Sequence, residues 1–127
     1  MSPARSLSTF VSGLTLSLAL AAPAQAADWD RAIARAERVM PGPVQCEPLR
    51  YTYVPTPQGN HVGYWDLKKC TIYVLKSQYG PYTTPELCQI LAHELGHAQG
   101  LEHSRNPRSV MYAYITGRYH RYCRGRW

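Results

Sequence analysis

Histidine and glutamate recur at a spacing that suits a metal site. His93 and His97 lie four residues apart, so on a helix their imidazoles share one face and can reach one ion. Glu94 follows the first histidine and can reach a metal-bound water as a general base. Gly100 lets the chain leave the helix sharply, which brings His103 back toward the same ion. Three neutral imidazoles leave a fourth position open for water, as catalytic zinc requires.

The complete run over residues 93–103 reads HExxHxxGxxH, with five positions fixed in type. Chance agreement with such a pattern is on the order of one in a million for each starting position at average amino-acid usage. The shorter HExxH alone would also fit a pair of surface histidines beside a solvated glutamate. For the complete pattern, the remaining alternative is zinc binding without catalysis.

Apolar residues recur at helical spacing in two segments. Residues 28–40 predict a first helix, which a Pro-Gly-Pro sequence then ends. A second helix is expected to carry the HExxH residues and to stop at Gly100. Thr84 is a good N-cap for it, and Thr83 with Glu86 offers a capping box one residue earlier.

Three strands are expected between these helices. Residues 49–54, 61–66 and 70–76 are rich in β-branched and aromatic side chains, and turn-forming residues separate them. The order is therefore helix, strands, helix, loop and tail. Such an order predicts a small α+β fold with a short sheet.

The first 26 residues resemble a secretory signal peptide. Arg5 supplies the positive charge, residues 14–22 form a short apolar run, and Ala24-Gln25-Ala26 is a cleavage site of the A-x-A type. The apolar run is too short for a membrane span, which needs about 20 residues. We therefore expect residues 27–127 to form one exported domain, secreted or held in the periplasm or envelope.

The four cysteines all lie in the predicted mature part. An even number in an exported chain indicates two disulfides, with three connectivities to choose from. We favour Cys46–Cys70 and Cys88–Cys123, because this pairing places one bond in each half of the chain. A cysteine zinc site is not expected, since no CxxC pair is present. A domain this small often needs such crosslinks.

The chain is basic, with a formal net charge of +6 at pH 7, and several arginines gather near its end. Tyrosines lie between them. Such a segment can bind nucleic acid, anionic lipid or an acidic cell-wall polymer. A solvated charged face is the simpler interpretation, so we expect a monomer without a nucleic-acid partner. An anionic envelope polymer is the alternative partner.

The histidine pattern resembles that of the metzincin zinc endopeptidases. Met111, eight residues after His103, lies in a Ser-Val-Met-Tyr sequence similar to the family's Met-turn, and Ser104 and Pro107 are similar to the matrixin branch in particular. The resemblance implies a zincin-like domain with an active-site helix, in which the three histidines bind Zn²⁺ and Glu94 activates water. It also implies that Met111 forms an apolar floor beneath the site and that a strand at 71–75 edges the cleft and pairs with an extended peptide.

The sequence departs from the family pattern at the residues after Met111 and in lacking one further motif. Ala113 stands where matrixins usually have proline and where astacin-like relatives have a tyrosine facing the zinc, so no fifth ligand is expected. No cysteine-switch motif is present. Tyr112 and Tyr114 are candidates to line the substrate pocket beyond the scissile bond, with ordinary packing as the alternative.

The function that these features predict is an exported zinc endopeptidase of minimal length. Glu94 would take a proton from the attacking water and pass it to the leaving amine. The alternatives are a non-catalytic zinc-binding module attached to an anionic polymer of the cell envelope, and an amidase that acts on cell-wall peptides.

Overall fold

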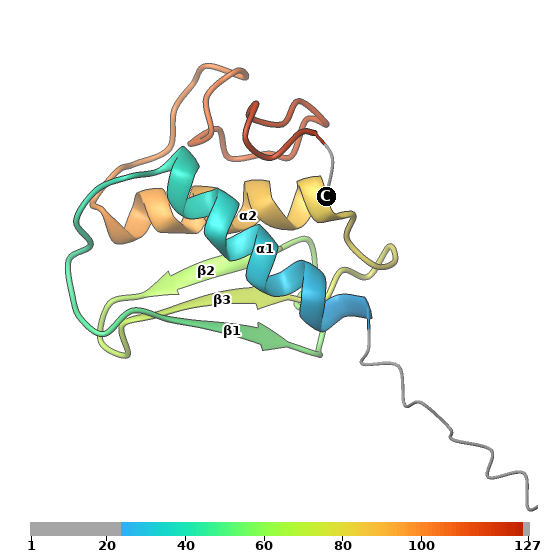
Figure 1. The fold of residues 1–127 in the computed structure, drawn as a ribbon, viewed down its shortest axis with the longest axis horizontal. Helices are drawn as coiled ribbons and strands as arrows, with labels where there is room; N and C mark the ends of the chain where they lie inside the picture. The colour runs from blue at the N-terminus through green and yellow to red at the C-terminus, as the bar shows by residue number, and fades with distance from the viewer. Residues whose placement is uncertain (1–23, 126–127) are drawn as a thin grey trace, which may run out of the picture.

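A computed structural model of the chain describes residues 24–125, so residues 1–23 of the predicted signal peptide lie outside the described residues. Two helices and three strands make up the fold (Figure 1), in the order α1 (Ala24–Val39), β1 (Arg50–Val54), β2 (Gly63–Asp66), β3 (Thr71–Leu75) and α2 (Thr84–Ala98). The predicted α+β fold is thereby confirmed. No helix in the described part combines the length and apolar character that a membrane crossing would need.

The sheet has the strand order β1-β3-β2, with β1 parallel and β2 antiparallel to β3. The central strand is the one whose residues are almost continuously apolar, and Ile72, Val74 and Leu75 are fully buried. The expectation that residues 71–75 edge the cleft is therefore wrong. Both sides of β3 are already paired within the sheet, so β1 and β2 are the edge strands, and β2 is the one whose residues line the cavity described below.

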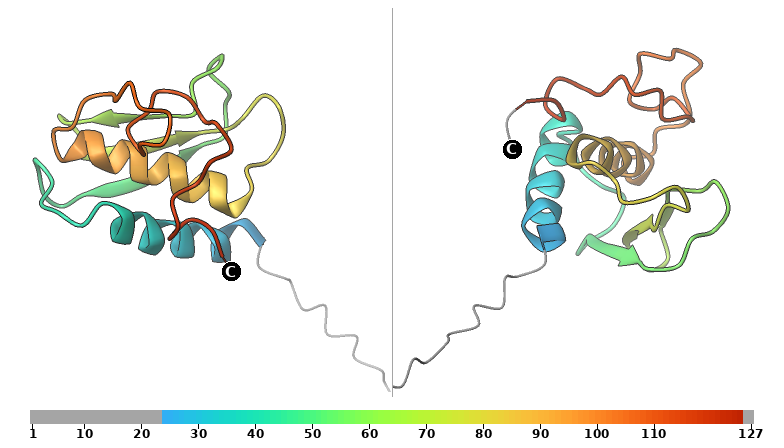
Figure 2. Two further views of the ribbon diagram at one scale, coloured as in Figure 1. Left: turned by 90° about the horizontal axis from the view of Figure 1, so that it is seen from above. Right: turned by 90° about the vertical axis from the view of Figure 1, so that its right-hand side faces the viewer.

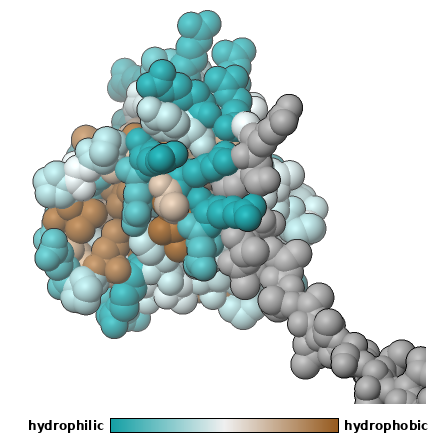
Figure 3. All heavy atoms as spheres, in the orientation of Figure 1, coloured by the Kyte–Doolittle hydropathy of each residue, from teal (hydrophilic) through white to brown (hydrophobic). Residues whose placement is uncertain are grey.

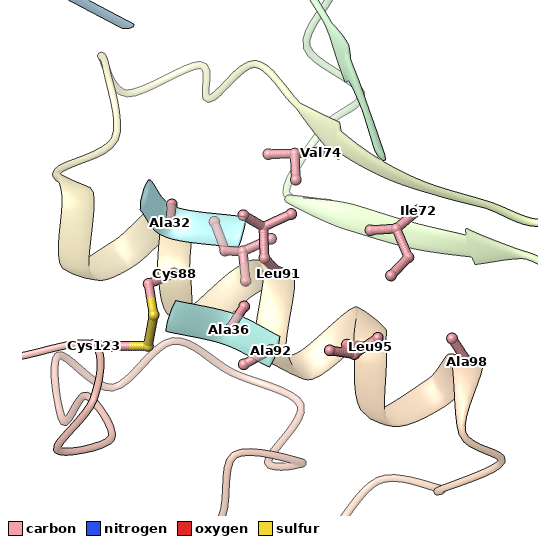
Figure 4. Close-up of a cluster of buried hydrophobic side chains, with 11 residues drawn as sticks. Ala32, Ala36, Ile72, Val74, Cys88, Leu91, Ala92, Leu95, Ala98 and Cys123 are labelled. Atoms are coloured by element: carbon pink, nitrogen blue, oxygen red, sulfur yellow. A yellow bond between two sulfur atoms is a disulfide. The ribbon is translucent and has the colours of Figure 1, made fainter. Parts of the chain in front are cut away.

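Both helices cover the same face of the sheet (Figure 2). Ala32 and Ala36 of α1 are completely buried, and these small side chains allow α1 to approach α2 closely. Leu91 of α2 belongs to the same buried cluster as Ile72 and Val74 of β3 (Figure 4). Because α2 lies in the middle of the core, its position is fixed by packing on both the sheet and α1.

Several element boundaries differ from those predicted, and each of the three strands is one or two residues shorter than expected. The helix α1 begins at Ala24 rather than at position 28, since the alanine-rich segment before Asp28 is a strong helix former, and the predicted cleavage point after Ala26 lies in its first turn. The N-cap of α2 is Thr83, not Thr84, because Thr83 and Glu86 form a complete capping box.

Two disulfides tie the irregular segments to these elements. Cys46–Cys70 links the segment before β1 to the start of β3, and Cys88–Cys123 links the C-terminal segment to the first half of α2. This is the pairing favoured from the sequence. Residues 101–125 form no regular helix or strand. They cover the top of the molecule in Figure 1 and present mainly hydrophilic side chains there (Figure 3).

Candidate metal centre and substrate cavity

The face of α2 that points away from the core carries His93 and His97. One turn separates them, and their Nε2 atoms lie 3.1 Å apart. The opposite face holds Leu91 and Leu95, both buried. The amphipathic pattern of the helix therefore anchors one side in the core and directs two imidazoles into a cavity.

His103 reaches the same point because α2 ends abruptly. Gly100 has a φ of +90°, a left-handed conformation that favours glycine, and the Leu101 amide donates to the carbonyl of Gly96 at 2.9 Å. The chain then reverses. The ligand atoms of the three histidines all lie within 4.8 Å of one another, and within residues 24–125 no other group of three or more metal-binding side chains gathers in this way.

Two of the histidines are oriented by backbone carbonyls. Nδ1 of His93 lies 2.8 Å from the Val110 oxygen, and Nδ1 of His97 lies 2.8 Å from the Leu101 oxygen. A carbonyl oxygen only accepts, so each Nδ1 carries a proton, and in a neutral imidazole this leaves the Nε2 lone pair as the ligand. Burial lowers the pKa of His93, which favours this neutral form.

This donor set fits zinc. Tetrahedral coordination at the usual Zn–N distance places two ligand nitrogens about 3.3 Å apart, close to the observed separation of the two Nε2 atoms. Ligating histidines ordinarily donate their second ring N–H to a carbonyl or carboxylate, as His93 and His97 do. Without a cation, the two facing lone pairs would repel each other.

The segment that follows His103 returns under the site. The Ser104 amide donates to the Met111 carbonyl at 2.8 Å, and Ser104 and Tyr112 form an isolated parallel bridge. Met111 is 6% exposed and lies against Gly96, where a Cβ atom would overlap the methionine sulfur. The absence of a side chain at Gly96 thus lets the methionine pack directly below the helix turn between His93 and His97.

Glu94 is the buried carboxylate of the site, only 5% exposed. Burial alone raises its pKa to about 7. Gly63 of β2 faces it, and a Cβ at that position would come within 3.2 Å of Glu94 Oε1 and 2.9 Å of the Tyr73 carbonyl. Gly63 therefore makes room for the carboxylate. Sequence reasoning missed this residue, although a glycine inside an expected strand often marks a close approach.

A cavity of about 500 Å³ opens beside the histidines. Its walls come from β2, from the outer face of α2 and from the segment after Met111. Tyr112 and Tyr114 both line it, and Tyr114 is 74% exposed. Gln89 and Arg118 also line it; Gln89 was not singled out from the sequence, and Arg118 was considered there only as one of the arginines of the basic C-terminal segment. The place of Arg118 in the cavity depends on the path of the C-terminal segment, which no local pattern reveals.

Comparison with known proteins agrees with this geometry. Over 30 residues the chain is 57% identical to a probable matrix metalloproteinase, 095L, of Invertebrate iridescent virus 3; the match covers 24% of this chain but only 8% of that protein. No solved structure matches the chain significantly. The matrixin family model matches residues 26–123, and thus nearly all of the part that the structure describes. The chain therefore belongs to the matrixin family of peptidases.

Proposed function

We propose that this protein is an exported zinc endopeptidase. The observation that carries the proposal is the convergence of three histidine ligand atoms beside the buried Glu94, at one end of a cavity. A bound zinc ion would supply a Lewis acid that polarises the scissile carbonyl and acidifies water. Family membership supports the same activity.

The residues of the chain would divide the remaining work. Glu94 accepts a proton from the attacking water and donates it to the leaving amine. Met111 and Gly96 support the helix turn that carries the ligands, while the Val110 and Leu101 carbonyls hold two imidazoles in their ligating orientation.

An extended peptide would bind along β2. This strand is paired on one side with β3, and its residues 63–65 line the cavity. A peptide added at the other side of β2 would gain backbone hydrogen bonds and pass directly by Glu94. The geometry thus supports a peptide substrate that pairs with β2 and not, as the family resemblance implied, with β3.

The working unit would be residues 27–127, released by cleavage after Ala26. Two disulfides suit a protein that functions in an oxidising compartment outside the cytoplasm. They also crosslink a domain in which only two helices and three strands support the site.

Zinc content and peptide cleavage should be measured together on the purified protein. We expect about one zinc per chain, cleavage within a peptide library, and loss of cleavage on chelation. Glu94→Gln should retain zinc and lose activity by at least about a thousandfold. Glu102→Gln, next to a ligand but exposed, is the matched control and should stay active.

Full activity of Glu94→Gln would refute the mechanism. Zinc binding without any cleavage would favour the non-catalytic module, and cleavage restricted to cell-wall peptides would favour the amidase.

A further inference from the structure

The wall of the cavity opposite β2 is a loop fixed at both ends. Its first end is the bridge between Ser104 and Tyr112. Its second end is attached to the start of α2, where the His120 amide donates to Gln89 Oε1 at 3.0 Å and Cys123 is bonded to Cys88. Residues 112–119 therefore span the cavity between two anchored points.

Arg118 lies just before the second anchor and lines the cavity. The next residue, Tyr119, packs against the hydrophobic core close to the Glu86 carboxylate. The Arg118 backbone amide contacts the Thr116 hydroxyl at 3.4 Å. No described residue forms an ion pair or hydrogen bond with the Arg118 guanidinium, which therefore keeps all its donors for a ligand.

Gln89 supplies a second donor at the same end. Its side-chain oxygen accepts the His120 amide, so its amide nitrogen is left to donate, and the residue lines the cavity. Arg118 is two residues from His120, and two residues span at most about 7 Å. The two residues that carry these donors therefore lie near each other in the cavity lining. Together they match the oxygens of a carboxylate.

The cavity lining also has an apolar part. Ile90, Val110 and Ile115 line it, and the one acidic side chain among the described lining residues is Glu94, which lies beside the metal ligands. A substrate side chain that enters here needs methylene groups followed by a negative charge. We propose that the cavity selects a glutamate side chain next to the scissile bond, with Arg118 and Gln89 as its hydrogen-bond donors. This inference rests on the proposed peptidase function.

Peptides that differ at one position test the inference. They carry Glu, Gln or Lys beside the cleaved bond and are blocked at both termini, so the Glu side chain is the only carboxylate. For the wild-type protein we expect kcat/KM to be about tenfold higher for the Glu peptide than for the Gln peptide. A partly solvated ion pair between Arg118 and the glutamate is strong enough to account for this ratio. Arg118→Gln should bring that ratio close to one, and Arg118→Glu should favour Lys.

Arg121→Gln is the matched control, because it removes the same charge from the same segment but lies outside the cavity lining. It should keep the tenfold preference. A second readout avoids catalysis: fluorescence anisotropy of labelled peptides on zinc-loaded Glu94→Gln protein should show the same order of affinities.

Cleavage of the Glu and Gln peptides at equal rates would overturn the inference while leaving the peptidase intact. An unchanged preference in Arg118→Gln would also overturn it. If no peptide is cleaved but the Glu peptide binds in an Arg118-dependent way, the proposed function fails and the carboxylate site stands.

Discussion

Replacement of Gly96 by alanine should reverse the usual effect of this substitution in a helix. Gly96 is buried inside α2, and its added Cβ would overlap the Met111 sulfur and lie 3.2 Å from the Met40 methyl group. Glycine to alanine in a helix interior ordinarily gains about 1 kcal/mol. Overpacking of a core costs about 1–3 kcal/mol. We therefore expect a net loss of up to about 2 kcal/mol.

The same substitution should weaken the metal site. Met111 must move to admit the methyl group, and the adjacent Val110 holds His93 through its carbonyl. Loss of such an orienting contact typically lowers metal affinity 10- to 100-fold. Competition for zinc with a chelator of known affinity would measure this directly.

A double-mutant cycle identifies the clash as the cause. Urea unfolding of the chelated proteins gives the free energies of unfolding of wild type, Gly96→Ala, Met111→Ala and the double variant. Met111→Ala alone should cost about 2–5 kcal/mol. In its background Gly96→Ala should become stabilising by up to about 1 kcal/mol, which gives a coupling energy of about 1–3 kcal/mol, equal to the cost of overpacking.

Equal stabilisation by Gly96→Ala in both backgrounds would contradict a steric clash with Met111. That result would mean that the methionine yields without cost and that the glycine serves no packing role.

Three further predictions concern stability. Double alanine replacement of Cys88 and Cys123 should cost about 4 kcal/mol of unfolding free energy in urea, because the bond closes a 35-residue separation; a loss below about 1 kcal/mol would contradict this. Burial raises the pKa of Glu94 from 4.5 to about 7, so the folded state favours the protonated carboxyl. In chelated protein, the unfolding free energy of wild type should therefore fall by up to about 3 kcal/mol relative to Glu94→Gln as the pH rises from about 5 to 8. A constant difference between the two proteins across that range would contradict the effect of burial. Thr83→Ala should lower the unfolding free energy by about 1 kcal/mol in thermal melts, because it removes the capping box, and Thr84→Ala should lower it much less. Equal losses for the two variants would mean that Thr83 is not the N-cap.

The sequence predicts the helix α2 and its ligands because the relevant interactions are local. The positions of His93 and His97 depend only on helical periodicity, and Gly100 marks the turn that brings His103 back. The favoured disulfide pairing also agrees with the structure, since each bond joins cysteines that are neighbours along the chain.

The errors and omissions concern contacts between distant segments. Strand order depends on which edges pair, so the apolar segment 71–75 could be recognised as a strand but not as the central one. Gly63 matters only because Glu94 comes to face it. Arg118 enters the cavity wall only through the attachment of its segment to α2. No local pattern contains these three facts.

The connectivity of the cysteines bears on how the chain acquires its bonds. Cys46 pairs with the next cysteine, and Cys88 with the last, so the two crosslinked loops neither overlap nor enclose each other. A chain that enters an oxidising compartment from its N-terminal end exposes its thiols in this same order. The first pair can be oxidised before a competing thiol arrives. Successive oxidation therefore yields the native bonds directly, without the slow reshuffling that interlaced disulfides require.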